Sequence, residues 1–224
     1  MQYQWILFDA DETLFHFDAF AGLKLMFSRF AIDFKDTDFE LYQHINKPLW
    51  VDYQNGLITA AELQTRRFIQ WGEKIGVSAQ QLNSHFLQDM AEICDLLPGA
   101  KALIDELVGK ASLGIITNGF TELQTVRLQK TGLLDAFDHV VISEEVGMAK
   151  PDVGIFEHAL ALMNYPERNK VLMVGDNPHS DILGGLNAGV DTCWLNCHEQ
   201  QASDGITPHY EVNSLYNLKL LLSN

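Results

Sequence analysis

The sequence has few basic residues and few cysteines. Its 224 residues include 15 Lys and Arg against 30 Asp and Glu, which gives a formal net charge of −15 at pH 7. Binding to nucleic acid usually depends on an excess of basic charge, so we expect no nucleic acid partner. Three cysteines without the spacing of a disulfide framework are typical of a reducing compartment, so we expect a cytoplasmic protein.

Long hydrophobic segments are also missing. The apolar runs at residues 171–174 and 218–222 are far shorter than the ~18 residues that a membrane-spanning helix needs. The first residues carry neither a basic region nor a cleavable apolar stretch, so we expect neither secretion nor a membrane partner. With 47% hydrophobic and 20% charged residues, the composition is that of an ordinary globular protein.

Five short apolar runs, each followed by polar residues or glycine, indicate buried β-strands. They lie at residues 5–8, 113–117, 140–143, 171–174 and 192–195. Helical patterns lie between the later runs. Thr121 begins one with a Thr-x-x-Gln capping box that ends at Lys130, and Asp152 caps another that ends at Met163. This alternation predicts an α/β fold with a doubly wound, mostly parallel sheet.

The first two strands are separated by about a hundred residues, several times the length of a single crossover. Within this gap, capping boxes begin at Thr59 and Ser78, and apolar residues follow each of them at helical spacing. We therefore predict an inserted α-helical cap domain at residues 16–94. The remaining residues, 1–15 and 95–224, would form the catalytic core.

Carboxylates follow the ends of two predicted strands. The first strand leads into Asp9 and Asp11, which would project to the same side if the strand reached Asp11. The fourth leads into Asp176 and Asp181. An isolated Asp-x-Asp is usually a helix cap. Here, however, the carboxyl ends of parallel strands meet at one edge of the sheet, where open α/β folds bind ligands, so we expect the four acids to lie close together.

The other strands bring groups suited to phosphate to the same edge. Thr117, Asn118 and Gly119 end the second strand beside a predicted helix N-terminus, and Lys150 follows the third. Four crowded carboxylates would repel one another by roughly 1 kcal/mol per pair at 4 Å in water, and by about 4 kcal/mol at an intermediate dielectric. A divalent cation such as Mg²⁺ relieves this repulsion and also binds phosphate, so the sequence favours phosphoryl chemistry.

In their order along the chain, these residues resemble the four motifs of the haloacid dehalogenase-like (HAD) hydrolases. The motifs are Asp9-x-Asp11-x-Thr13-Leu14, the strand-terminal Thr117, Lys150-Pro151 and Gly175-Asp176-x-x-x-x-Asp181. The match spans the chain and implies a Rossmann-like core with a helical cap. Residues 9–15, 46–56 and 115–120 look like the bacterial pyrimidine 5′-nucleotidase branch, the dUMP phosphatase type. Glu12 departs from the family pattern, in which many members have glycine.

The resemblance implies a Mg²⁺-dependent phosphomonoesterase of nucleotide metabolism, with 5′-nucleotidase activity. Asp9 would be the nucleophile that forms an aspartyl-phosphate. Asp11 would be the general acid that protonates the leaving alcohol and then the base that activates water. Thr117 and Lys150 would hold the phosphoryl oxygens, helped by nearby backbone amides.

The resemblance also implies a metal site, with Mg²⁺ as the cofactor and Mn²⁺ able to replace it. The metal ligands would be the carboxylates of Asp9 and Asp176 and the backbone carbonyl of Asp11. Asp181 and Asn177 would hold metal-bound waters or the lysine.

Substrate choice should depend on the predicted cap, because the core residues would contact only the phosphoryl group. Our candidates for substrate binding are Asn118, Phe15, His16, Asn46 and Trp50. An aromatic face could stack on a nucleobase, while Asn46 could bind its edge. Phe15 and Trp50 also fit a packing role. We expect a small phosphorylated substrate, a nucleoside monophosphate such as dUMP, dTMP or UMP, and a monomer or small homo-oligomer.

Other functions fit parts of the pattern. The same scaffold would suit a phosphatase for small sugar phosphates or phosphoglycolate, or a phosphomutase. In a dehalogenase Asp11 would have no catalytic role, because that reaction has no leaving alcohol to protonate. A signalling receiver domain would carry its phosphate-accepting Asp on a middle strand, where this sequence has Thr117 and Lys150. A silent binding protein would not need the intact set of acids. We interpret Cys193 as a core thiol rather than a metal ligand.

Overall fold

A computed structural model describes residues 2–201 and 205–223. Its centre is one sheet of six parallel strands, in the order β3-β2-β1-β4-β5-β6. The strands are β1 (Trp5–Phe8), β2 (Ser112–Thr117), β3 (His139–Ile142), β4 (Val171–Gly175), β5 (Asp191–Leu195) and β6 (Tyr210–Val212). The first five confirm the predicted strands. The sequence gives no signal for β6, because it is short and only partly buried.

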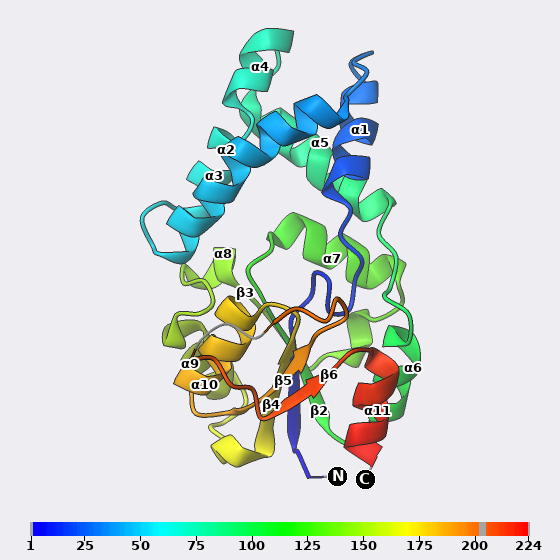
Figure 1. Ribbon diagram of the computed structural model, residues 1–224, viewed down its shortest axis with the longest axis vertical. Coiled ribbons are helices and arrows are strands. Elements are labelled where there is room, and N and C mark those ends of the chain that lie inside the picture. Colours follow the sequence, from blue (N-terminus) through cyan, green and yellow to red (C-terminus); the bar gives the residue numbers. More distant parts are fainter. Residues whose placement is uncertain (1, 202–204, 224) are drawn as a thin grey trace.

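Helices cover both faces of this sheet (Figure 1). They are α6 (Ala100–Leu107), α7 (Thr121–Lys130), α8 (Ser143–Val146), α9 (Val153–Leu162), α10 (Leu183–Asn187) and α11 (Leu215–Ser223). Successive residues of β1 point to opposite faces, as the period of a strand requires. Phe8 packs with Leu103 of α6 and Leu218 of α11, whereas Leu7 packs with Phe156 of α9. The predicted doubly wound parallel α/β fold is therefore confirmed.

The helix starts around the sheet agree only in part with the predicted caps. Asp152 caps α9 as expected, since its side chain accepts a hydrogen bond from the backbone N–H of Gly154. The capping box at Thr121 is wrong, because the N-cap of α7 is Phe120 and makes no side-chain bond. Instead, the carboxylate of Glu144 in α8 accepts from the backbone N–H of Thr121 at 2.8 Å. A distant side chain supplies this cap.

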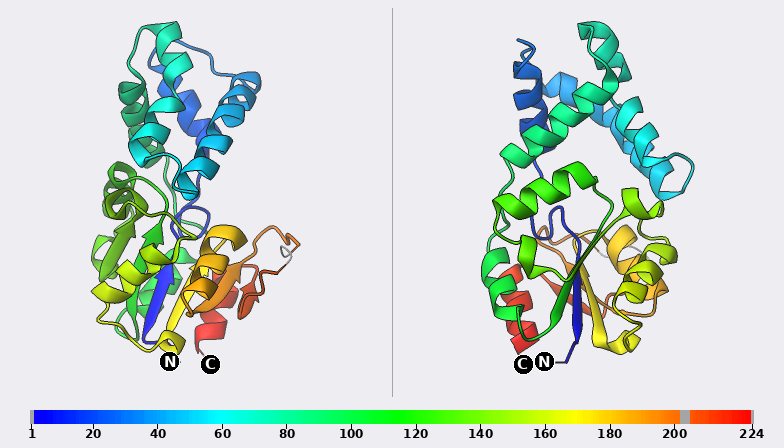
Figure 2. Two further views of the ribbon diagram at one scale, coloured as in Figure 1. Left: turned by 90° about the vertical axis from the view of Figure 1, so that its left-hand side faces the viewer. Right: turned by 180° about the vertical axis from the view of Figure 1, so that it is seen from behind.

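Five further helices form a second body beyond the carboxyl ends of the strands (Figures 1 and 2). They are α1 (Ala19–Ser28), α2 (Asp36–Gln54), α3 (Ala60–Arg66), α4 (Ile69–Ile75) and α5 (Ala79–Glu92). Capping boxes begin α3 at Thr59 and α5 at Ser78, as predicted. The helices enclose an aromatic core of their own that includes Phe27, Tyr42 and Phe86. We call this body the cap; the exact boundaries at residues 16 and 94 stay a prediction.

Strand order decides which loops meet below the cap. β1 lies between β2 and β4, so that Phe8 pairs with both Ile115 and Val174. The chain segments that leave β1, β2 and β4 therefore emerge side by side, at the switch point where doubly wound sheets bind ligands. Among the described residues, no helix combines the length and the apolar character needed to cross a membrane.

Candidate active site

Lys150 lies at the centre of the polar groups at this sheet edge. Its side chain is 1% exposed. The Nζ atom donates to Oδ1 of Asp9 at 2.6 Å, to the carbonyl oxygen of Ile116 at 2.7 Å, and lies 2.7 Å from Oδ1 of Asp181. An ammonium group has three N–H donors, so these three acceptors use all of them. Lys150 therefore holds the loop after β1 against the loop after β4.

Three carboxylates cluster at this edge, and two of them, Asp9 and Asp181, bind Lys150. Oxygen atoms of Asp9, Asp176 and Asp181 all lie within 4.8 Å of one another. Burial, and the negative charge of Asp181, raise the pKa of Asp9 to about 7, although Lys150 opposes the shift. Burial, together with Asp181 and Asp9, raises the pKa of Asp176 to about 8. Such a set of hard oxygen donors with excess negative charge fits a divalent cation.

Asp9 and Asp11 do not share a strand face as predicted, because β1 ends at Phe8. Asp9 still continues the pairing for one residue, since its N–H donates to the carbonyl of Val174 at 2.8 Å. Asp11 lies in the following turn, where its Oδ1 contacts a guanidinium nitrogen of Arg127. The two acids therefore have different partners. Asp9 faces Lys150, and Asp11 faces the arginine.

Arg127 is a site residue that sequence reasoning missed. Its side chain is 1% exposed, its guanidinium lies 4.4 Å from the ring centre of Phe15, and its Nε donates to Gln124 at 2.8 Å. Gln124 and Arg127 are buried on α7 together with Leu123 and Leu128. Two long polar residues on the apolar face of a helix were the available signal. Asp11 and Phe15, which Arg127 contacts, lie far away in the chain.

The polar residues after β2 support Lys150 from its backbone. The Asn118 side chain donates to the carbonyl of Lys150 at 2.9 Å and accepts from the N–H of the same residue at 2.7 Å. Thr117 is buried, and its hydroxyl accepts from the N–H of Gly119 at 3.0 Å. Because both polar atoms of its amide bind the backbone of Lys150, the Asn118 side chain positions the lysine.

Two predicted site residues have other roles in the structure. Phe15 was expected to contact substrate, but it is fully buried in the core beneath Arg127. Asn177 was expected near the metal, but its side-chain oxygen accepts from the N–H groups of His179 and Ser180 and caps the turn that follows. Packing and capping account for these two side chains without a ligand, and their contacts with substrate or metal stay predictions.

That capped turn also fixes the last acid of the set. The turn, η3 (Pro178–Ile182), carries Asp181, whose carboxylate accepts from the N–H of Asn177 at 3.0 Å and from the hydroxyl of Ser180 at 3.0 Å. The side chain is 1% exposed. With these donors and Lys150 around it, Asp181 is bound on every side by the protein itself.

Glu12 adopts a backbone conformation that favours glycine, with φ of 55°. The left-handed region costs roughly 1–2 kcal/mol for a residue with a side chain. The Glu12 carboxylate accepts from the N–H of Phe17 at 2.6 Å and lies 3.1 Å from Nδ1 of His16. These contacts offset the backbone cost and place an anion and an exposed imidazole at the entrance between the core and the cap.

A cavity of about 590 Å³ lies between Asp11 and the cap, within the range of roughly 300–1,000 Å³ that is usual for ligand pockets. Asp11, Glu12 and His16 line its core side. Its cap side is mainly aromatic and polar, and is formed by Phe17, Phe20, Phe39, Tyr42, Gln43, Asn46, Trp50, Arg67 and Phe86. The predicted pair Asn46 and Trp50 therefore does face the cavity. Arg67 was not predicted.

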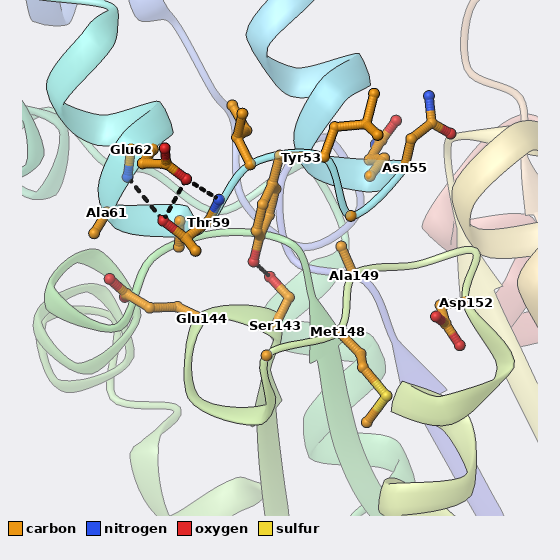
Figure 3. A pocket seen from close by; sticks show the side chains of 16 residues that line it. Tyr53, Asn55, Thr59, Ala61, Glu62, Ser143, Glu144, Met148, Ala149 and Asp152 are labelled. Carbon is orange, nitrogen blue, oxygen red and sulfur yellow. Dashed lines mark hydrogen bonds between the residues drawn. The ribbon is translucent and has the colours of Figure 1, made fainter.

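A second hollow lies where the end of α2 meets the core (Figure 3). There the Tyr53 hydroxyl points toward the core and donates to the hydroxyl of Ser143 at 2.7 Å, and both groups are buried. Beside this contact, Gln64 of α3 donates to Glu144, the residue that caps α7. These hydrogen bonds tie the cap to the loop after β3.

A family model described as haloacid dehalogenase-like hydrolase matches residues 3–189, which include every motif at the sheet edge. The chain belongs to the haloacid dehalogenase-like hydrolases. The resemblance that the sequence motifs indicated is thereby confirmed. This hydrolase carries the family pattern on the strand ends that the structure brings together.

Three relatives are similar along their whole length. The chain is 55% identical to pyrimidine 5′-nucleotidase YjjG of Escherichia coli, with 99% of each chain covered. It is 34% identical to pyrimidine 5′-nucleotidase PynA of Streptococcus pneumoniae, covering 97% of this chain and 94% of that one. The crystal structure of the putative HAD-hydrolase YfnB of Bacillus subtilis, bound to magnesium, superposes with a TM-score of 0.85 at 29% identity and covers both chains fully.

Proposed function

We propose that this hydrolase is a Mg²⁺-dependent 5′-nucleotidase for pyrimidine nucleoside monophosphates such as dUMP, dTMP and UMP. The single observation that carries the proposal is the 55% identity with YjjG across the whole chain. The acids and Lys150 supply the means of phosphoryl transfer, and the aromatic cavity beside them supplies room for a nucleoside.

Asp9 is the nucleophile in this proposal. Lys150 binds its Oδ1, which leaves Oδ2 for attack on phosphorus. The new bond joins Oδ2 to phosphorus while the bond to the ester oxygen breaks, and Asp11 gives its proton to the departing alkoxide. In the second half, the carboxylate of Asp11 takes a proton from water, the hydroxide oxygen bonds to phosphorus, and Asp9 leaves as a carboxylate. Inorganic phosphate and the nucleoside are released.

The phosphoryl oxygens need donors at the same edge. We assign this task to the hydroxyl of Thr117, the N–H of Asn118 and the ammonium of Lys150. Because the three donors of Lys150 already have acceptors, a phosphoryl oxygen binds it by taking the place of one of them. Donors fixed in advance stabilise the charge that develops in the transition state.

Asp9 and Asp176 would hold Mg²⁺, with the backbone carbonyl of Asp11 as a further ligand, and Mn²⁺ would replace it. The raised pKa values of both carboxyls support this assignment, since a cation would relieve the repulsion that raises them. When bound, the ion neutralises the phosphate and the attacking carboxylate. Asp181, which is enclosed by protein donors, holds Lys150 rather than the metal.

The domain division and the setting of the enzyme are part of the same proposal. Residues 16–94 would form the cap and the rest the catalytic core. The free thiols of Cys94 and Cys193 support a reducing, cytoplasmic location. Neither a nucleic acid nor a membrane is assigned as a partner, and a monomer or small homo-oligomer is the assembly we propose.

A substrate panel tests the proposal. Hydrolysis of dUMP, dTMP, UMP, phosphoglycolate, small sugar phosphates and p-nitrophenyl phosphate is measured with Mg²⁺, with Mn²⁺ and with a chelator. We expect the highest kcat/KM for the pyrimidine nucleotides and no turnover with the chelator. A preference for phosphoglycolate or a sugar phosphate would overturn the nucleotidase assignment, and full activity in the chelator would overturn the metal dependence.

A further inference from the structure

Arg67 is a buried cation that pairs with no anionic side chain among the described residues. It follows the last residue of α3, is 3% exposed, and lines the cavity between the cap and the core. Within the described part of the chain, its side-chain hydrogen-bond acceptor is the amide of Asn83, and it forms no ion pair with a carboxylate. A buried charge is costly unless other groups compensate for it. Neutral groups of the protein, a ligand, or both must therefore stabilise the charge of Arg67.

Neutral groups provide part of this compensation. The guanidinium lies 5.2, 5.2 and 5.1 Å from the ring centres of Phe68, Phe86 and Phe120. Its Nε and one terminal nitrogen donate to the side-chain oxygen of Asn83. Because a guanidinium has five N–H donors, these contacts do not exhaust it. Asn83 uses two of the five donors and the nearby Tyr42 hydroxyl can take a third, so two remain for an acceptor in the cavity.

An acceptor without a partner lines the same cavity. The side-chain oxygen of Asn46 is buried and accepts no hydrogen bond from any residue that the structure describes. Asn46 stands one helical turn after Tyr42 on α2, and Tyr42 interacts electrostatically with Arg67. Trp50 follows one turn later and also lines the cavity. A free acceptor and free donors therefore face a space walled by aromatic rings.

We propose that Arg67 and Asn46 are specificity-determining residues that bind the imide edge of a uracil or thymine ring; this rests on the nucleotidase function proposed above. Arg67 donates to a ring carbonyl oxygen, and the Asn46 oxygen accepts from N3–H. The aromatic walls stack on the ring. Cytosine presents a lone pair at N3 where uracil presents a hydrogen, so it leaves the Asn46 acceptor unpaired and is bound less well.

The first test changes the substrate and keeps the enzyme intact. Wild-type protein is assayed on dUMP, N3-methyl-dUMP, dCMP and 2-deoxyribose 5-phosphate, which keeps the sugar and phosphate but has no base. We expect N3-methylation to lower kcat/KM by about 10- to 100-fold, as the loss of a buried hydrogen bond does. In Asn46→Ala the same methylation should lower kcat/KM by less than about threefold, since the variant lacks the acceptor. An equal cost in both proteins would overturn the assignment of Asn46.

The second test addresses Arg67. In Arg67→Met, we expect the ratio of kcat/KM for dUMP to that for 2-deoxyribose 5-phosphate to fall by about tenfold or more, mainly through KM for dUMP. The matched controls are Arg66→Met, on the exposed neighbour, and His44→Ala, on the exposed side of α2; both should keep the wild-type ratio. A ratio that is unchanged in a folded Arg67→Met protein would overturn the role of Arg67. If Arg67→Met fails to fold, Arg67→Lys takes its place under the same criterion.

The outcomes separate this inference from the nucleotidase function itself. If the wild type prefers dUMP over 2-deoxyribose 5-phosphate but both variants keep that preference, the nucleotidase function stands and the inference is wrong. If the wild type shows no preference for dUMP over the abasic phosphate, the proposed nucleotidase function fails, and the inference fails with it.

Discussion

Arg127 binds Asp11 although the two residues lie 116 positions apart in the sequence. The arginine is buried on α7 and stacked on Phe15, so it forms a rigid support for a carboxylate whose side chain is 31% exposed to the cavity. Such a support restricts the rotamers of Asp11. General acids act efficiently only when they are held near the proton acceptor.

We predict that Arg127→Met weakens proton donation more than it weakens phosphate binding. Methionine keeps the contact with Phe15 but cannot hold Asp11. Nucleoside monophosphates have a poor leaving group, so their kcat/KM should fall by about tenfold or more, within the range that general acid catalysis contributes. The leaving group of p-nitrophenyl phosphate needs little protonation, so kcat/KM for this substrate should fall several-fold less. An equal fall on both substrates would indicate a purely structural role.

Asp9→Asn should abolish turnover. The amide oxygen is a poor nucleophile, and Asp181 cannot take its place because its carboxylate is enclosed by Lys150, Ser180 and Asn177. We expect the metal-free variant to melt within a few degrees of the wild type, because losing a carboxylate relieves repulsion while Lys150 keeps Asp181. Mass spectrometry after brief exposure to substrate should detect a phosphorylated wild type and an unmodified variant. Substantial Mg²⁺-dependent turnover by Asp9→Asn would contradict the assignment.

The raised pKa values predict how pH affects stability. Both carboxyls have pKa values near 4 when unfolded, whereas the fold raises the pKa of Asp9 to about 7 and that of Asp176 to about 8. The folded state therefore binds more protons, and this contribution to stability is present below about pH 4 and is lost as the pH rises to about 8. In the metal-free protein, the melting temperature should fall over this interval relative to Asp176→Asn.

Mg²⁺ should reverse that trend, because it competes with protons for the same carboxylates. At a concentration 100 times its Kd, a ligand stabilises a protein by about 2.7 kcal/mol, and each kcal/mol raises the melting temperature of a protein of this size by roughly 2–4 °C. The rise in melting temperature on adding Mg²⁺ should be larger at pH 8 than at pH 6. A gain that is independent of pH, or that persists in Asp176→Asn, would place the metal elsewhere.

Tyr53→Phe should loosen the cap. The variant loses only the hydroxyl that donates to Ser143, a buried contact worth about 1 kcal/mol, or roughly a fivefold change in the equilibrium constant for contact between cap and core. We expect KM for nucleotides to rise by about that factor while kcat changes little. Ser143→Ala serves as the matched partner. The double variant should be no worse than either single one, and additive effects would show that the two hydroxyls act separately.

The central strands could be predicted from the sequence because buried parallel strands are continuous apolar runs, and Asp9, Lys150 and Asp176 were found because each follows such a run. The convergence of these residues is a property of the sheet, whose strand spacing is fixed. The sheet does not determine which side chains bind these acids. Lys150 could be placed from its position beside a strand end, whereas Arg127 and Arg67 lie on helices and become part of the site only through tertiary packing.

For capping residues too, the sequence does not predict which partner a side chain binds. Thr121 carries the local pattern of a cap, but Glu144 reaches the same N–H group from a neighbouring loop and takes its place. Asn177 shows the opposite case, since a side chain expected near the metal is used by its own turn. Local patterns predict what a side chain is able to bind. Which partner it finds depends on distances that only the folded chain sets.

The central position of β1 has a consequence for biosynthesis. This strand leaves the ribosome first, yet its two neighbours, β2 and β4, are translated much later. A nascent chain that ends before Val171 therefore carries Asp9 on a strand with one edge unpaired, and it lacks Asp176 and Asp181 altogether. Truncated products of this protein should accordingly be inactive and prone to aggregation, and the emerging segment is a natural client for chaperones.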